Sequence, residues 1–320
     1  MKAVLLAAGL GKRLLPITKS IPKPMIMIAG KPLLEYIIED LTKSGFDEIC
    51  LVVGHLRNHI EDYFKDGSKY NVKISYVIQH DFVGTASATK LTKSFVNEEP
   101  FLLYLADTII PYNLEENLQR IISNDSEIGL LSAKIQKNNI KNVGNIEVKD
   151  GFVIKINEKS LDSKSDLGWA GVAFFKSNYI FEIIDELNPS FRNEFEITEA
   201  MNLMLNHNRK IRNYICEKYI DAGTISGILE LNNFILNQHK FSRNHIPKTL
   251  QNELKNPVYI GTNCDIDDNV SIGPFVSIGN DVLIDANVKI EQSVIMDGAQ
   301  ISPNQKISHS LVSIDGKISL

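Results

Sequence analysis

Two kinds of apolar pattern alternate along the first 110 residues. Ala3 to Ala8 is a continuous apolar run with no polar face, which is typical of a parallel strand that is covered on both sides. Apolar residues then recur at helical spacing between Pro32, which suits a first helical turn, and Gly45, which ends the helix. Further elements expected on the same grounds are strands at 48–53, 72–78 and 101–106, an amphipathic turn at 60–64 and a helix after Gly84. This alternation predicts βαβ units and a doubly wound parallel sheet, in a Rossmann-like α/β domain.

From residue 258 the apolar period changes to six. Isoleucines stand at every sixth position from Ile260 to Ile290, and a second apolar series runs two positions ahead of them from Val258. After one dropped residue the spacing resumes at Ile295 and continues to Ile307. A hexapeptide period with an inward aliphatic residue is typical of a parallel β-helix, whereas ordinary hairpins would alternate every two residues. We therefore expect a short left-handed parallel β-helix.

These patterns divide the 320 residues into three segments. The first is an α/β domain over 1–238 that ends with a helix at 225–238, the second a polar connector over 239–256, and the third the β-helix over 257–320. A tail of this kind is expected to act as a cap or an oligomer interface, so we expect a homo-oligomer.

Composition narrows the function classes. The 34 Lys and Arg against 39 Asp and Glu give a net charge of −5 without a long run of like charge, which argues against a nucleic-acid binder. No apolar stretch approaches the roughly 20 residues of a membrane span, so a cytoplasmic protein is expected. Cys50, Cys216 and Cys264 are too widely spaced for a disulfide framework or a CxxC metal site.

The first strand opens into a basic loop that contains glycines. Gly9 and Gly11 would let backbone N–H groups approach phosphate oxygens, and Lys12 and Arg13 would add charge-assisted hydrogen bonds. The loop is neither a Walker loop nor a dinucleotide fingerprint, because no Gly-Lys-Ser/Thr follows and position 14 is Leu. Ligands of open α/β sheets bind beyond the carboxyl ends of the strands, where 9–13, 79–84 and Asp107 all fall.

Further motifs follow the loop in a fixed order. They are 22–24 (P-K-P), 76–88 (Y-V-I-Q-H-D-F-V-G-T-A-S-A), 105–107 (L-A-D), Gly144, 158–160 (E-K-S), 192–198 (R-N-E-F-E-I-T) and 221–224 (D-A-G-T). Together with 9–14 (G-L-G-K-R-L) they resemble the sugar-nucleotide pyrophosphorylases, which are sugar-phosphate nucleotidylyltransferases. Among these the chain looks most like the glucose-1-phosphate thymidylyl- and uridylyltransferases with a β-helical tail.

The resemblance implies an enzyme that transfers a nucleotidyl group from dTTP or UTP to a sugar 1-phosphate, with glucose 1-phosphate as the expected acceptor. It implies Arg13, Lys23 and Lys159 as catalytic residues, and Asp107 and Asp221 as the carboxylates that hold Mg²⁺. It assigns the nucleotide to Ala8, Gly9, Gly11, Lys12, Gln79, Gly84 and Thr85, and the sugar phosphate to Gly144, Glu158, Lys159, Gly171 and Arg192. The chemistry agrees, because two anionic substrates need cations and Mg²⁺ prefers one or two carboxylates plus substrate oxygens.

Alternatives stay open. The nearest is a mannose-1-phosphate guanylyltransferase, although Gln79 five residues before Gly84 favours a pyrimidine. Thr108, which stands where the family commonly has Asn, and Ser87 lie where the edges of the substrates would be read, so the base and the sugar are undecided. A hexapeptide acyltransferase would need a histidine base, and His309 is the one candidate near the coils. A silent regulatory relative would be expected to have lost Arg13, Lys23, Asp107 or Asp221, and all four are present.

Overall fold

A computed structural model of the chain describes residues 1–123, 125–135, 143–158, 165–190, 192–238 and 254–320. It forms two compact units, one of Met1–Gly9 with Ile37–Tyr219 and the other of Leu10–Tyr36 with Ile220–Leu320. The glycine-containing loop is thus divided, because Gly9 belongs to the first unit and the residues from Leu10 on belong to the unit that holds the C-terminal region. The domain boundaries at 238 and 257 stay predictions, and the expected connector lies outside the described residues except for its last three positions.

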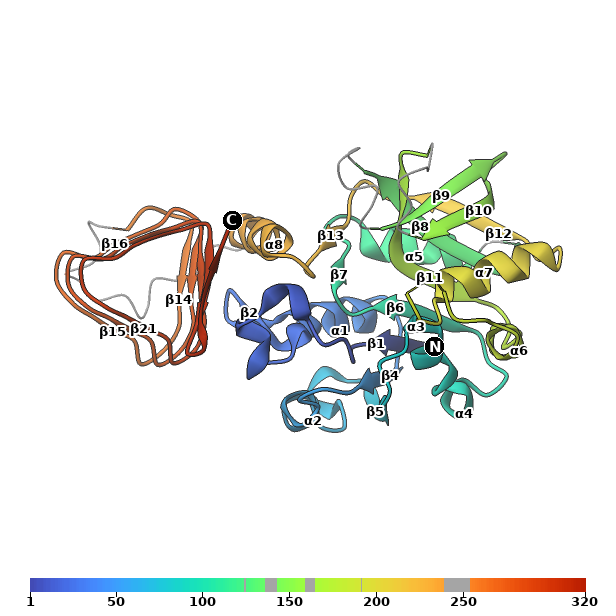
Figure 1. Cartoon of the computed structure of the whole chain (residues 1–320), viewed down its shortest axis with the longest axis horizontal. Helices are drawn as coiled ribbons and strands as arrows, with labels where there is room; N and C mark the ends of the chain where they lie inside the picture. Colours follow the sequence, from blue (N-terminus) through green and yellow to red (C-terminus); the bar gives the residue numbers. More distant parts are fainter. Residues whose placement is uncertain (124, 136–142, 159–164, 191, 239–253) are drawn as a thin grey trace. The chain divides into compact units, whose positions relative to one another are not determined.

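The first unit is built on a nine-stranded sheet in the order β5-β4-β1-β6-β11-β8-β12-β10-β9 (Figure 1). Its strands are β1 (Lys2–Leu6), β4 (Glu48–Val53), β5 (Lys73–Ile78), β6 (Phe101–Leu105), β8 (Ile128–Lys134), β9 (Gly144–Lys149), β10 (Phe152–Glu158), β11 (Leu167–Phe175) and β12 (Ile211–Ile215). The strands β5, β4, β1 and β6 are parallel neighbours, as predicted, with Val4 opposite both Cys50 and Leu103. The whole sheet is mixed, because β11 runs antiparallel to both β6 and β8.

Helices connect these strands. They are α1 (Leu33–Lys43), α2 (Asn58–Phe64), α3 (Thr85–Lys90), α4 (Lys93–Val96), α5 (Leu114–Ile122), α6 (Ile180–Asp185) and α7 (Ile197–Asn206). The apolar positions that predicted α1 are buried, with Leu34, Ile38 and Leu41 fully so, because this stripe faces the core. The helix begins after Pro32, and Gly45 ends the turn at a φ of +86°, a conformation that glycine adopts easily.

The remaining elements before residue 225 are short. They are β2 (Met27–Ile28), β3 (Lys31–Pro32), β7 (Thr108–Ile109), β13 (Ile220–Asp221) and the 3₁₀ turns η1 (Lys12–Leu14), η2 (Ile17–Lys19), η3 (Lys23–Met25) and η4 (Ser68–Tyr70). The core of the first unit includes Phe101 stacked between Phe175 and Phe181, with ring centroids 5.1 and 5.8 Å away. This packing holds rigid the strands whose ends carry the candidate site.

The second unit contains α8 (Ile225–Gln238), with the predicted bounds, and stacked coils of short strands that outline a triangle (Figure 1). One side holds β14 (Val258–Ile260), β17 (Val276–Ile278), β20 (Val294–Ile295), β23 (Ser310–Ser313) and β24 (Gly316–Ser319). The others hold β15 (Asp265–Ile266), β18 (Leu283–Ile284) and β21 (Gln300–Ile301), and β16 (Ser271–Ile272), β19 (Lys289–Glu291) and β22 (Lys306–Ser308). The successive strands are parallel, except that β24 returns antiparallel to β23. These strands are thus consistent with the parallel β-helix that the hexapeptide period predicts, and its left-handedness stays a prediction.

Asparagines stand at turns between the strands of the coils. Asn263, Asn269, Asn287 and Asn304 all have φ between 55° and 63°, the left-handed region that asparagine tolerates better than most residues. The amides of the last three stack from coil to coil, since Asn269 Nδ2 donates to Asn287 Oδ1 at 3.4 Å and Asn287 Nδ2 donates to Asn304 Oδ1 at 3.3 Å. Stacked partners are 18 residues apart in the first coils and 17 in the later ones, which matches the dropped residue in the isoleucine series.

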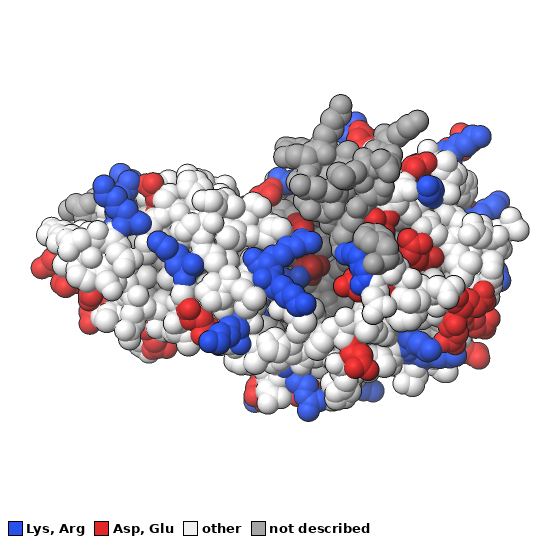
Figure 2. Space-filling model, viewed as in Figure 1, with Lys and Arg blue, Asp and Glu red and all other residues white. Residues whose placement is uncertain are grey.

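Charge and helix length add two observations. Basic and acidic side chains are interspersed on the face that Figure 2 shows. Among the residues that the structure describes, no helix is both long enough and apolar enough to cross a membrane. The expected homo-oligomer and cytoplasmic location stay predictions.

Candidate functional site

In the first unit, the segments that the resemblance assigns to the nucleotide follow the carboxyl ends of two parallel strands. After β1, Ala8 is buried and Gly9 is exposed, with nothing within 4 Å of a Cβ placed on it. After β5, Gln79 is 6% exposed and its Nε2 lies 3.4 Å from the carbonyl oxygen of Gly84. The side chain that was predicted to contact the base therefore also spans the turn that leads into α3.

Gly84 lies against the backbone of a segment more than a hundred residues away. The Phe195 amide donates to the Val83 carbonyl at 2.7 Å, and the Phe195 carbonyl accepts from the Ala86 amide at 2.8 Å. A Cβ on Gly84 would lie 2.4 Å from the Phe195 carbonyl oxygen, and φ at Gly84 is +114°. Only glycine allows this approach without strain, so the residue joins the 76–88 motif to the 192–198 motif.

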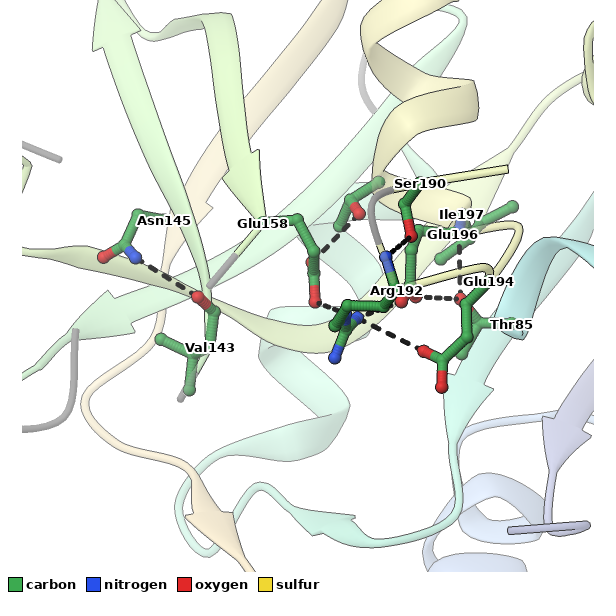
Figure 3. A network of polar contacts seen from close by, with 10 residues as sticks. Thr85, Val143, Asn145, Glu158, Ser190, Arg192, Glu194, Glu196 and Ile197 are labelled. Atoms are coloured by element: carbon green, nitrogen blue, oxygen red, sulfur yellow. Dashed lines mark hydrogen bonds and ion pairs between the residues drawn. The ribbon is translucent and has the colours of Figure 1, made fainter. Parts of the chain in front are cut away.

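Thr85 reinforces this junction with its side chain. Its hydroxyl donates to Glu196 Oε2 at 3.2 Å and accepts from the Ile197 amide at 3.0 Å (Figure 3). Ile197 is the first residue of α7, where backbone N–H groups have no partner within the helix. Thr85 therefore caps α7 from another part of the chain.

Arg192 is surrounded by three carboxylates, as Figure 3 shows. Its Nη2 forms an ion pair with Glu196 and lies 3.3 Å from Glu194 Oε2 and 3.5 Å from Glu158 Oε1. The side chain of Glu196 is 6% exposed and that of Glu158 12%, so two of the three pairs are largely shielded from water. Bonds to charged groups in such shielded places are stronger than exposed ones and fix the guanidinium in one orientation.

Glu158 ends β10 and is held on its other side. Thr198 Oγ1 donates to Glu158 Oε2 at 2.9 Å. A Cβ on Gly144 would lie 3.2 Å from the same oxygen and 3.3 Å from Thr198 Cγ2, so a small residue at 144 leaves room for this carboxylate. The sequence prediction that Gly144, Glu158 and Arg192 share one site agrees with this arrangement. Lys159, predicted beside them, lies outside the described residues.

Asp107 follows β6 and is half-buried. Gly171, in β11, approaches the same strand end, since a Cβ there would lie 3.0 Å from Thr108 Oγ1 and 3.2 Å from Leu105 Cβ. Gly171 has a φ of +71° and lies within a register shift of β11 between Trp169 and Ala173. The irregular strand therefore brings its backbone close to the end of β6.

From Leu10 on, the basic loop belongs to the second unit. Gly11 precedes η1 with a φ of +62°, and its carbonyl accepts from Thr18 Oγ1 at 2.9 Å. Lys12 and Arg13 lie in η1 and are exposed, while Lys23 begins η3 and is half-buried. These backbone turns orient three cations and leave the charges of Lys12 and Arg13 exposed.

Asp221 is in the same unit, just before α8. Its Oδ1 accepts from the Gly223 amide at 2.7 Å. A Cβ on Gly223 would lie 2.7 Å from that oxygen and 3.6 Å from Lys23 Nζ, so both charged groups border this glycine. A Cβ on Gly227 would lie 1.7 Å from the Asp221 carbonyl oxygen, which requires glycine at the start of α8.

Asp107 and Asp221 carry hard oxygen donors, which suit Mg²⁺. The described residues include no group of three or more His, Cys, Asp or Glu side chains arranged to hold a metal ion. A magnesium ion would therefore depend on one or two carboxylates and on the oxygens of the substrate.

Glu196 and Thr198 were not predicted as site residues, although both lie in the 192–198 motif. The spacing of the motif gives no sign that Glu196 faces Thr85 or that Thr198 faces Glu158, because these partners are 111 and 40 residues away. A signal was present only in the residue types, since two acids beside an arginine predict ion pairing.

The model of the family described as nucleotidyl transferase matches residues 2–238. The chain belongs to the nucleotidyl transferase family. A second model, described as GMPPB C-terminal domain, matches residues 254–319 of this family member. The match over 2–238 includes every residue of the candidate site.

Curated relatives of this nucleotidyl transferase are similar over most of its length. The low-salt glycan biosynthesis nucleotidyltransferase Agl11 of Haloferax volcanii is 36% identical over 239 residues, which cover 74% of this chain and 66% of that protein. A glucose-1-phosphate thymidylyltransferase of Streptomyces antibioticus is 28% identical over 296 residues, which cover 86% of this chain and 82% of that protein. The chain thus spans just under two thirds of Agl11. A solved UDP-glucose pyrophosphorylase complexed with UDP-glucose has a TM-score of 0.67 at 27% identity, covering 74% of this chain and 99% of that one.

Proposed function

We propose that this chain transfers a nucleotidyl group from dTTP or UTP to a sugar 1-phosphate, with glucose 1-phosphate as the expected acceptor. The observation that carries the proposal is the link from Thr85 through Glu196 to Arg192. It joins the segment assigned to the nucleotide to the segment assigned to the sugar phosphate. Relatives named for thymidylyl transfer and for UDP-glucose support the same choice of substrates.

The reaction is a single displacement at phosphorus. An oxygen of the sugar 1-phosphate attacks the α-phosphorus of the nucleotide and forms the new P–O bond. The bond from the α-phosphorus to the bridging oxygen breaks, and pyrophosphate leaves with its electron pair. No covalent enzyme intermediate is required, so positioning and charge stabilisation supply the rate enhancement.

The basic loop would hold the triphosphate. Exposed Arg13 can neutralise charge that develops on the leaving group, and Lys23 adds a second cation beside Asp221. Asp107 and Asp221 would hold Mg²⁺, which when bound neutralises phosphate charge.

The acidic cluster would hold the sugar. Glu158 can accept hydrogen bonds from sugar hydroxyls, because Thr198 and the space over Gly144 fix its carboxylate. Arg192 would face the phosphate of the sugar, held in position by Glu196. Three carboxylates around one guanidinium leave the cluster short of positive charge, so a second cation is needed for the phosphate, and Lys159 is proposed for that role.

The deciding experiment measures pyrophosphate release by the full chain with Mg²⁺ and glucose 1-phosphate. dTTP, UTP, GTP, CTP and ATP are tested separately, and each is repeated with mannose 1-phosphate and N-acetylglucosamine 1-phosphate. Release with dTTP or UTP is expected. Release only with GTP would replace this proposal with guanylyl transfer, and silence in every well would overturn nucleotidyl transfer itself.

The metal assignment has its own test. Asp107→Asn and Asp221→Asn are expected to abolish turnover, because each removes a carboxylate charge while keeping the shape of the side chain. Wild-type activity should disappear with a chelator and return with added Mg²⁺. A folded variant that keeps near-full activity would refute the assignment of that residue.

A further inference from the structure

The C-terminal hairpin of the β-helix lies against the basic loop within the second unit. Strands β23 and β24 both contact η2, which lies between the Lys12–Arg13 pair and Lys23 along the chain. The hydroxyl of Ser20 donates to the carboxylate of Asp315, 295 residues further along the chain. A Cβ on Gly316 would lie 3.0 Å from Pro16 Cγ. The loop is therefore held from outside at two points, Pro16 and Ser20.

The hairpin is a firm support for this contact. Ser313 pairs with Gly316 across a two-residue turn, so Asp315 is at its tip. The Asp315 amide donates to Ser313 Oγ at 3.1 Å, which fixes the orientation of the turn. Leu311 of β23 is fully buried, so the hairpin is anchored in the β-helix.

The held part of the loop is packed onto the part that carries the charges. Ile17 and Thr18 are 0% and 2% exposed. A Cβ on Gly11 would lie 2.8 Å from Thr18 Cγ2 and 3.4 Å from Lys23 Cβ, so these three residues form one cluster. A displacement at Ser20 would therefore reach Gly11 and Lys23 through close contacts.

The β-helix also supports the second charged segment of the unit. Asn232 of α8 is fully buried, donates to the Phe275 carbonyl at 3.1 Å and accepts from Ser277 Oγ at 2.5 Å. Since α8 begins four residues after Asp221, coils of the β-helix hold both Asp221 and the basic loop in one body.

We propose that Asp315 is a positioning residue for the phosphate-binding loop, acting through its hydrogen bond to Ser20. The β-helix would then be a working part of the nucleotide site rather than only a cap or an oligomer interface. This inference rests on the proposed function, which assigns Arg13 and Lys23 to the triphosphate.

Steady-state kinetics on the full chain provide the first test. Asp315→Ala and Ser20→Ala are each expected to raise KM for the nucleotide roughly tenfold, or ~1.4 kcal/mol. KM for the sugar phosphate should change less than twofold, a separation that general destabilisation would not give. The double variant should be no worse than either single variant, and Asp315→Asn, which still accepts the hydrogen bond, should restore most of the affinity.

The matched control is Ile314→Ser, at a neighbouring position of the same turn that is 67% exposed. It should leave both KM values unchanged. Equal effects on both KM values, multiplicative effects in the double variant, or a nucleotide KM within twofold of wild type in Asp315→Ala would overturn the inference.

Amide hydrogen exchange separates this inference from the proposed function. Peptides that cover 12–25 should exchange faster in Asp315→Ala and Ser20→Ala than in wild type, while peptides that cover 85–90 should not change. Unchanged exchange over 12–25 refutes the positioning role whether or not the wild type releases pyrophosphate. An inactive wild type with altered exchange would refute the proposed function alone.

Discussion

Replacing Thr85 by valine tests the junction between the two substrate segments. Valine has the shape of threonine, so the packing around residue 85 is kept and only the hydroxyl is lost. That hydroxyl makes two bonds, to Glu196 Oε2 at 3.2 Å and from the Ile197 amide at 3.0 Å. Both partners are in or next to the first turn of α7, so the change affects how this helix is held.

The loss of stability in Thr85→Val follows from the bonds that Ile197 and Glu196 keep. The Ile197 amide loses the hydroxyl that caps it, and water does not replace that hydroxyl because Ile197 is 1% exposed. Loss of a helix cap costs about 1–2 kcal/mol. Glu196 loses one donor but keeps its ion pair with Arg192, so its share is below the ~1.5 kcal/mol of a full bond to a charged group. We expect Thr85→Val to lower the free energy of unfolding by about 2–3 kcal/mol in total.

Trp169 makes this effect measurable in the first unit alone. It is the single tryptophan of the chain, is 7% exposed and lies in the central strand β11. Urea unfolding followed by its fluorescence therefore reports the unit that contains Thr85. Thr42→Val is the matched control, because the Thr42 hydroxyl bonds only to the Ile38 carbonyl one turn back, among the contacts described.

We expect Thr42→Val to change stability by less than about 0.5 kcal/mol. Thr85→Ser, which keeps the hydroxyl, should recover most of the loss. If Thr85→Val unfolds at the same urea concentration as Thr42→Val, the junction does not hold α7 and the link to Arg192 loses its basis.

Two further predictions concern the same unit. Gly84→Ala should destabilise it by more than Gly45→Ala, because both glycines have positive φ but only a Cβ on Gly84 would meet backbone, at 2.4 Å, while one on Gly45 would meet a methionine methyl at 3.7 Å. Equal urea midpoints for these two variants would contradict the close approach. Burial raises the pKa of the Cys50 thiol from 9.0 to about 11, so the folded state holds that proton more tightly than the unfolded state does. The free energy of unfolding should therefore fall as pH rises from 9 to 11, by at most ~3 kcal/mol from this group. The Cys50→Ala variant should lack that part of the fall when it and the wild type are unfolded in urea at pH 8 and at pH 10.5. If the difference in free energy of unfolding between the wild type and Cys50→Ala does not change with pH, the thiol is not shielded.

Elements with a strong local pattern could be predicted from the sequence. The bounds 48–53 and 225–238 agree with β4 and α8, and the six-residue period agrees with the coils of the second unit. Periodicity works in these cases because every position repeats the same burial environment. The antiparallel insertion of β11 between β6 and β8 was not predicted, because strand order depends on contacts between distant segments.

For the candidate site, the sequence by itself determined which charged residues and glycines are present and that their motifs occur in the order of a nucleotidyl transferase. Only the tertiary structure decided that Glu196 holds Arg192, that Gly84 lies against the backbone of Phe195, and that Asp315 holds Ser20. The physical reason is that hydrogen bonds and ion pairs require atoms within about 3–4 Å of each other. Sequence spacing sets such distances within one helix or strand, and the packing of the whole chain sets them between segments that are far apart.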